Sequence, residues 1–233
     1  MFPFFFDPTY IIVVPAILLA LYAQMRVRNA YARYSQIPTA RGLTGAEAAG
    51  EILRRNGLSS VQVERIDGVL SDNYDPRTRV LRLSSGVYDG ASIASVGVAA
   101  HETGHALQHA AHYAPLWLRS TIVPVAQFGS FLAWPLFFIG FLFHSGASWP
   151  LMELGILFYS VSVAFTLITL PVEFDASGRA MRALTSEGLV TSDELTGVRA
   201  MLSAAALTYV AAAATAVLEL ARLLLLANMR RED

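Results

Sequence analysis

Four apolar runs, separated by polar stretches, dominate the hydropathy pattern of the chain. They cover residues 8–26, 122–143, 151–171 and 205–227. Each is close to the roughly 20 apolar residues that an α-helix needs to cross a bilayer. The pattern therefore predicts a mainly α integral membrane protein with about four transmembrane helices. The first run lacks the basic start and the small-residue cleavage site of a secretory signal, so we expect a retained anchor.

The stretch between the first and second runs, residues 27–120, has the periodicities of a water-facing fold. Thr44 and Glu47 have the spacing of a capping box, which predicts a short helix ending at Asn56–Gly57. Ser92 is expected to cap another helix that continues to about Ala111. Between these helices, alternating residues predict a small β-hairpin or sheet at 61–66, 68–74 and 80–83, with a turn at 75–78.

The composition agrees with a membrane protein and excludes several kinds of partner and ligand. Hydrophobic residues make up 55% and charged residues 15% of the chain, and the mean hydropathy is +0.47. Charged residues make up about a quarter of ordinary soluble domains. A net charge of −1 provides no basic patch, so we expect no nucleic-acid partner. There is no cysteine, so any bound metal must be held by His, Asp or Glu.

The placement of arginine residues predicts the orientation in the membrane. Arginines follow the first apolar run, precede the second and follow the third. The turn at 144–150, between the second and third runs, has none. These arginines are Arg26, Arg28, Arg33, Arg41, Arg119, Arg179, Arg182 and Arg199. The positive-inside rule then places residues 27–120 in the cytoplasm. Arg230 and Arg231, after the fourth run, would lie outside and conflict with this orientation.

One motif in the chain has recognisable chemistry, His101-Glu102-Thr103-Gly104-His105. Histidines four residues apart share one face of a helix, so both imidazoles can bind one zinc ion. Glu102 between them is then placed to act as a general base on water. The preceding stretch, Ser92–Ala100, is almost wholly apolar or small, which indicates a buried helix. The alternative is a hydrogen-bonded histidine pair in a protein core, but burying these groups without a partner would cost several kcal/mol.

A catalytic zinc ion needs a third protein ligand. His109 and His112 follow the motif, but one straight helix cannot bring a residue eight positions on around the same ion, so we expect His109 to lie near the site without binding zinc. The metzincin pattern fails because Gln108 and Ala111 occupy its glycine and histidine positions.

Two carboxylates at the end of the third apolar run provide a better candidate for the third ligand. We expect Glu173 to bind zinc and Asp175 to orient a histidine by accepting its distal N–H. The rival acidic residues stand among polar neighbours and are expected to face water. They are Glu51, Glu64, Asp67 and Asp72.

The chain resembles the YugP-type neutral zinc metallopeptidases of bacterial membranes over nearly its whole length. The resemblance lies in five runs: Ser71–Arg77, Leu81–Ser84, Ala99–Gln108, Pro171–Ser177 and Leu207–Ala211. It implies a zinc-dependent peptidase in the bacterial inner membrane, crossing it several times.

A more distant similarity is to the HtpX and CAAX prenyl protease gluzincins. In those proteins an aspartate follows the zinc-binding glutamate by four positions, but here that position is Ser177 and the nearest aspartate is Asp175.

We therefore expect a membrane zinc endopeptidase with a small α+β, zincin-like catalytic region. The expected divisions are a first anchor at 1–26, the zincin-like region at 27–120, a transmembrane hairpin at 121–172, and a third-ligand helix with the last span at 173–233. Tyr209, His109 and Arg179 are candidates for stabilising the oxyanion. An exposed strand edge is expected to bind the substrate backbone. It would consist of Val80, Leu81, Arg82, Leu83 and Ser84.

The expected partners are the lipid bilayer and a peptide or protein substrate, which includes membrane proteins. The main alternative is a membrane scaffold that binds zinc without catalysis, although a structural zinc site has no use for Glu102. A metal transporter would need ionisable residues inside several spans, and the second and third runs offer essentially none before Glu173. Glu219 and Arg222 lie three apart in the fourth run, and we expect them to pair near the membrane interface or at a contact between helices, without catalytic chemistry.

Overall fold

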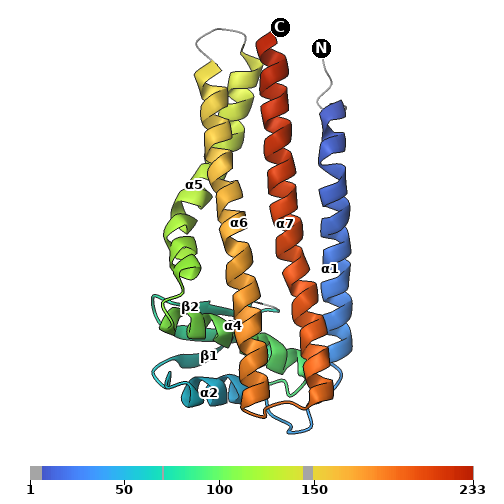
Figure 1. The fold of residues 1–233 in the computed structure, drawn as a ribbon, viewed down its shortest axis with the longest axis vertical. Coiled ribbons are helices and arrows are strands. Elements are labelled where there is room, and N and C mark those ends of the chain that lie inside the picture. The colour runs from blue at the N-terminus through green and yellow to red at the C-terminus, as the bar shows by residue number, and fades with distance from the viewer. Residues whose placement is uncertain (1–6, 70, 144–148, 233) are drawn as a thin grey trace. The chain divides into compact units, whose positions relative to one another are not determined.

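The computed structural model describes residues 7–69, 71–143 and 149–232, and this part of the chain is mostly helical (Figure 1). The expectations for Met1–Phe6, for Leu70 and for residues 144–148 lie outside the described residues, as does the side chain of Arg231. The elements are a 3-10 helix at Pro8–Ile12, α1 at Val14–Tyr34, α2 at Gly45–Arg55, β1 at Gln62–Ile66, β2 at Asn73–Asp75, β3 at Val80–Ser84, α3 at Ser85–Tyr88, α4 at Ile93–Ala110, α5 at Ala114–Leu142, α6 at Trp149–Ser186 and α7 at Ser192–Glu232.

Three helices in the described chain are long and apolar enough to cross a membrane. The segments are Ala114–Leu142 in α5, Pro150–Ser186 in α6 and Ser192–Arg230 in α7. They confirm the second, third and fourth predicted spans in length and composition, but the helices continue well beyond the apolar runs. The first run falls on the 3-10 helix and the start of α1, which is not among these three segments. A fourth span therefore stays a prediction.

The chain forms two compact units. The first consists of the residues up to Tyr22, of Leu118–Leu170 and of the residues from Thr208 onward. The second consists of Ala23–Trp117 and Pro171–Leu207. Helices α1, α5, α6 and α7 each contribute residues to both units.

In the first unit, α5, α6 and α7 pack through large apolar side chains. Phe137, Met152 and Leu223 are buried together, one from each helix. Two glycines bring α5 and α6 close, because a side chain on Gly140 would meet the backbone of Met152 and one on Gly155 the backbone of Phe137. Small residues at such contacts are typical of packed membrane helices.

Arg222 of α7 is the centre of a buried polar network in the same unit. Its side chain donates to Glu219 Oε1 at 2.6 Å, to Asp7 Oδ2 at 2.8 Å and to Thr9 Oγ1 at 3.1 Å. The guanidinium also lies 3.6 Å from the centre of the Tyr10 ring. The Glu219–Arg222 pair thus forms within α7, and Arg222 links it to the N-terminal segment. The described contacts include no catalytic group.

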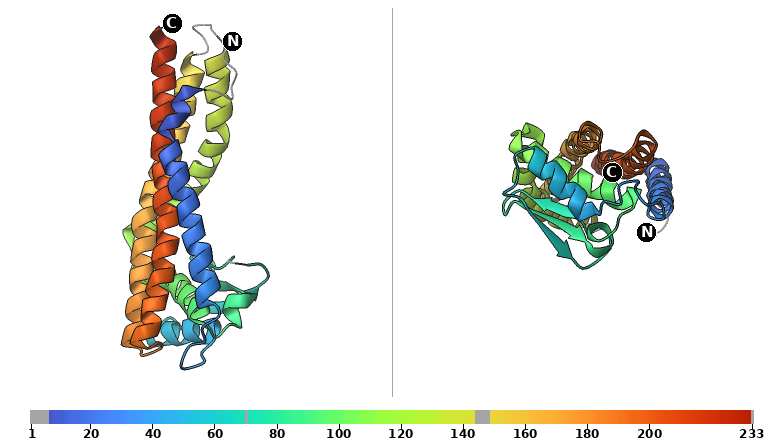
Figure 2. Two further views of the ribbon diagram at one scale, coloured as in Figure 1. Left: turned by 90° about the vertical axis from the view of Figure 1, so that its right-hand side faces the viewer. Right: turned by 90° about the horizontal axis from the view of Figure 1, so that it is seen from below.

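Helix α4 forms the middle of the second unit (Figure 2). One side packs against buried residues of α6 and α7, among them Leu184 and Val198. The other side packs against α2 and β3, where Leu53 and Leu81 are fully buried or nearly so. This double packing explains why the first turns of α4 are apolar or small. The predicted start is confirmed, because the Ser92 hydroxyl accepts from the Ser95 N–H.

The second unit also contains a three-stranded sheet in the order β1-β3-β2. Strand β1 runs parallel to β3, whereas β2 pairs antiparallel with it, with Tyr74 opposite Leu81. The predicted hairpin is confirmed as β2–β3, with Arg79 at φ 55° in its turn. The predicted exposed edge at Val80–Ser84 is wrong, because β3 is paired on both sides and four of its five residues are buried. The edge strands of the described sheet are β1 and β2.

Two local predictions have different outcomes. The capping box is present, with the Thr44 hydroxyl accepting from Glu47 N–H and the Glu47 carboxylate accepting from Thr44 N–H. Among the described residues of the predicted strand 68–74, however, only 73 and 74 belong to a strand, β2. Just before it, the Asp72 carboxylate accepts from the backbone N–H of Ser84 at 2.7 Å. A side chain thus bonds the backbone at the end of β3, and this contact corrects the expectation that Asp72 simply faces water.

Candidate active site

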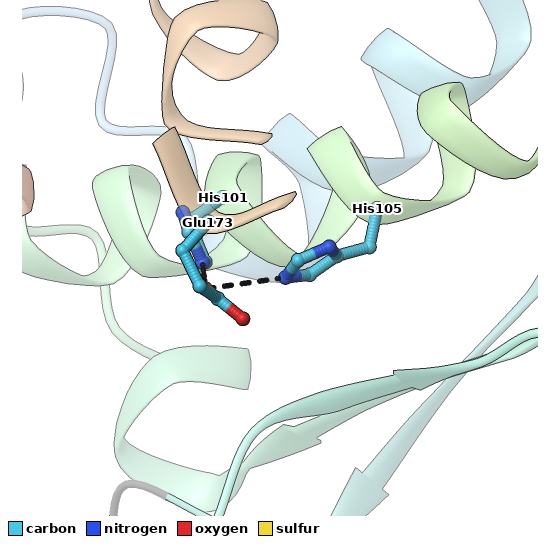
Figure 3. A group of neighbouring side chains, drawn as sticks. All are labelled: His101, His105 and Glu173. Carbon is cyan, nitrogen blue, oxygen red and sulfur yellow. Dashed lines mark hydrogen bonds and ion pairs between the residues drawn. The ribbon is translucent and has the colours of Figure 1, made fainter. Parts of the chain in front are cut away.

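His101, His105 and Glu173 converge in the second unit (Figure 3). Helix α4 places the two histidines one turn apart, and α6 supplies the glutamate. His101 Nε2 lies 3.1 Å and His105 Nε2 3.6 Å from the same oxygen, Glu173 Oε2. Each of the three side chains offers one ligand atom, and these atoms lie within 4.8 Å of one another. The structure therefore brings together the three residues that the sequence singled out as zinc ligands.

The geometry of this cluster fits a tetrahedral zinc ion. With zinc–ligand distances of about 2.0–2.1 Å, the ligand atoms of a tetrahedral site lie about 3.3 Å apart. The 3.1 and 3.6 Å distances to Glu173 Oε2 bracket that value. Glu173 is 2% exposed and His105 8% exposed, and a carboxylate buried so deeply needs a cation or hydrogen-bond donors. Two imidazoles and one carboxylate leave a fourth position open, as catalytic zinc sites require.

Gly104 allows α6 to approach α4 closely enough for Glu173 to reach the histidines. A side chain at this position would collide with the backbone carbonyl of Ala176. The same contact places Ser177, on the next turn of α6 after Glu173, beside His101. The sequence alone does not reveal this function of Gly104, although the residue stands inside the motif.

The distal nitrogens of both histidines have polar partners. His101 Nδ1 lies 3.1 Å from Ser177 Oγ, and His105 Nδ1 lies 3.0 Å from Gln108 Oε1. Such contacts fix the ring orientation of metal-binding histidines. The prediction that Asp175 accepts directly from a histidine is corrected, because Asp175 accepts from Gln108 Nε2 at 2.9 Å instead. Sequence reasoning missed Gln108 and gave Ser177 no role.

Glu102 is half-buried beside the cluster. Burial raises the pKa of its carboxyl to about 7, and the nearby carboxylates of Glu173 and Asp72 act in the same direction, whereas His101 opposes them. The backbone N–H of Tyr74 donates to this carboxylate. Strand β2, at the edge of the sheet, therefore lies directly against the group expected to act as the base.

Two of the three other predicted site residues, His109 and Arg179, have contacts that define their surroundings, whereas the third, Tyr209, does not lie in the same compact unit. His109 Nδ1 lies 2.9 Å from the Tyr74 hydroxyl, so His109 contacts β2 through Tyr74. Arg179, a candidate for the oxyanion, donates to Asp175 at 2.6 Å and lies over the Tyr113 ring. Tyr209 belongs to the other compact unit, so its proposed role is untested.

Three of the four rival acidic residues lie at the surface, as expected. Glu51 pairs with Arg54 and Arg55 on α2, Glu64 pairs with Arg82, and Asp67 is exposed. None of the three belongs to the cluster of potential ligands in the described residues.

Zinc-dependent peptidases typically have a histidine pair on one helix with a glutamate between them, and a carboxylate from a later helix completes the ligand set. Comparison with known proteins leads to the same class. The chain belongs to the family described as "Putative neutral zinc metallopeptidase", which matches residues 9–228. It is 47% identical over 220 residues to the "Putative membrane protease YugP" of Bacillus subtilis (strain 168), covering 94% of this chain and 96% of that protein. No solved structure matches the chain.

Proposed function

We propose that this protein is a membrane-embedded zinc endopeptidase of the gluzincin type, with His101, His105 and Glu173 as zinc ligands. The observation that supports this most directly is the approach of both Nε2 atoms to Glu173 Oε2, with Glu102 alongside. A scaffold that binds zinc only for stability is not favoured, because it has no use for a glutamate held against the site. The family membership supports the same class.

A zinc ion bound to these ligands would supply Lewis acidity, which activates a water molecule and polarises the scissile carbonyl. Glu102 accepts a proton as the water oxygen attacks the carbonyl carbon. It then delivers that proton to the nitrogen as the C–N bond breaks, which releases a carboxylic acid and an amine.

The substrate is proposed to bind as an extended segment along the edge of β2, at Asn73–Asp75. This strand replaces the predicted site on β3, whose edges are both paired. Main-chain hydrogen bonds to an edge strand select an extended conformation without reading particular side chains. Loosely folded segments of membrane proteins are therefore the proposed substrates. From the arginine placement, we propose that the site faces the cytoplasm and that the first apolar run forms a fourth span of the bacterial inner membrane.

The variant Glu102→Gln tests this mechanism. It preserves the size of the side chain and its bond with the Tyr74 N–H but removes the base, so cleavage should fall by at least about a hundredfold. Zinc content and thermal stability should stay unchanged. The measurement combines metal analysis of detergent-purified protein with cleavage of casein.

The control is Glu64→Gln, which changes a surface carboxylate on β1 that pairs with Arg82. This variant should cleave like the wild type. If Glu102→Gln binds zinc and cleaves as fast as the wild type, the mechanism is wrong. If the zinc-loaded wild type cleaves neither casein nor unfolded membrane proteins, the scaffold alternative gains support.

A further inference from the structure

Gln108 is a fully buried polar side chain in direct contact with a proposed zinc ligand. It lies on α4 just under one turn after His105, and its exposed fraction is 0%. Its amide oxygen lies 3.0 Å from His105 Nδ1. Its amide nitrogen donates to the Val172 carbonyl at 2.7 Å and to Asp175 Oδ2 at 2.9 Å. The amide thus connects the histidine on α4 with the beginning of the α6 segment that follows Pro171.

The partners of the amide determine which way it points. The Val172 carbonyl can only accept hydrogen bonds. Asp175 is also an acceptor, because the permanently charged Arg179 donates to the same carboxylate oxygen at 2.6 Å. Only the NH₂ group of Gln108 can satisfy both of these acceptors. The amide oxygen must therefore face His105.

An amide oxygen accepts and cannot donate, so it selects one tautomer of His105. The hydrogen must be on Nδ1, which leaves the lone pair of a neutral ring on Nε2. Nε2 is the atom that lies 3.6 Å from Glu173 Oε2. His101 differs, because its distal partner is the Ser177 hydroxyl, which can donate or accept and so does not dictate a tautomer.

We propose that Gln108 is a positioning residue that fixes the tautomer and ring orientation of His105 for metal binding, and that Asp175 and Arg179 act on the histidine through this amide. The proposal rests on the zinc site proposed above. It gives Asp175 an indirect function in place of the predicted direct contact. It also assigns a function to the position at which the metzincin pattern has glycine.

The first test is the affinity for zinc of Gln108→Leu, measured by competition with a chromophoric chelator on detergent-purified protein. The substitution preserves most of the volume and removes the three hydrogen bonds, so affinity should fall about 10- to 100-fold, as for other partners of metal-bound histidines. Nitrogen-15 NMR of labelled histidine in the metal-free protein should show His105 with its hydrogen on Nδ1 in the wild type. The signal should shift toward the other tautomer in the variant.

The matched control is Thr103→Val on the same helix. Thr103 is also fully buried, and its hydroxyl bonds to the carbonyl of Ala99 in the same helix. The threonine side chain has nearly the same shape as that of valine. This variant should retain wild-type affinity for zinc and the wild-type histidine spectrum.

A paired substitution tests the donor and acceptor assignment even if Gln108→Leu fails to fold. Gln108→Glu alone directs a second carboxylate at Asp175 and should weaken zinc binding. Adding Asp175→Asn supplies a donor to that carboxylate, which can then accept from both Asn and His105, so part of the lost affinity should return, although the Val172 carbonyl still lacks its donor.

The outcomes separate this proposal from the zinc site on which it rests. If the wild type binds zinc tightly, and Gln108→Leu binds it within about twofold with an unchanged tautomer, the role of Gln108 is wrong and the zinc site stands. A Gln108→Glu variant that gains nothing from Asp175→Asn also contradicts it. If the wild type itself binds no zinc, both proposals fall.

Discussion

Glu173 supplies the carboxylate oxygen that lies beside both histidines of the described site. Glutamine at this position would retain the shape and one oxygen acceptor but would be a much weaker ligand for a divalent cation. We predict that Glu173→Gln lowers zinc affinity by at least about tenfold, with metal content of the purified protein as the measurement.

The control for this substitution is Glu187→Gln, just after the end of α6. Glu187 accepts from Asn56 and lies outside the cluster of ligands. Its variant should bind zinc like the wild type. Full zinc occupancy in Glu173→Gln would mean that the third ligand is a different residue.

Part of this site could be predicted from the sequence and part could not, and the difference has a physical reason. The spacing of His101 and His105 is a property of one helix, so it can be read directly from the chain. Glu173 could be inferred because a carboxylate at the end of an apolar run is costly unless it has a partner. The contacts of Gln108 and Ser177 depend on how closely α4 and α6 approach. No local pattern in the sequence encodes that approach.

At the scale of elements, the contact between α4 and α6 depends on the absence of a side chain at Gly104. Alanine there would press against the Ala176 carbonyl and move the helices apart. We predict that Gly104→Ala destabilises the protein by about 1–3 kcal/mol, the usual cost of overpacking. It should also weaken zinc binding, because Glu173 would be displaced from the histidines. Thermal unfolding and metal analysis measure the two effects.

Gly50 in α2 provides the matched control for this substitution. It is also a helical glycine, but a side chain there would meet nothing within 4 Å. Gly50→Ala should therefore stabilise the helix by about 0.5–1 kcal/mol and leave zinc binding unchanged. If Gly104→Ala behaved like Gly50→Ala, close packing at Gly104 would not be what holds Glu173 in place.

The elements themselves were predictable where a single segment determines them. Caps at Thr44 and Ser92, the hairpin turn and three long apolar helices all follow from local sequence. The strand order did not, because β1 and β2 pair with β3 through contacts between separate segments. That is why β3 was expected to present a free edge. The apolar runs also predicted helices that are too short. Residues beyond the runs continue the helices into the second unit, where one face of each helix packs.

At the scale of the whole molecule, orientation in the membrane can be tested because the chain contains no cysteine. Ser60 is exposed in the segment before β1, so a single cysteine there would be a unique and accessible target. The arginine placement predicts that Ser60→Cys reacts with a membrane-impermeant thiol reagent only after cells are opened. Ser145→Cys, in the turn that the sequence places on the opposite side, should react in intact cells. The reverse pattern would overturn the proposed cytoplasmic site.

Helix α6 has a further consequence for how the protein is made. It is one continuous helix, Trp149–Ser186, that includes both a segment apolar enough to cross a membrane and the proposed third ligand. Glu173 is 72 residues downstream of His101, so at 5–20 residues per second the ribosome reaches it about 4–14 s later. During that interval the nascent chain has two histidines and no complete site. The proposed zinc site would therefore stay incomplete until the helix that supplies Glu173 has been made.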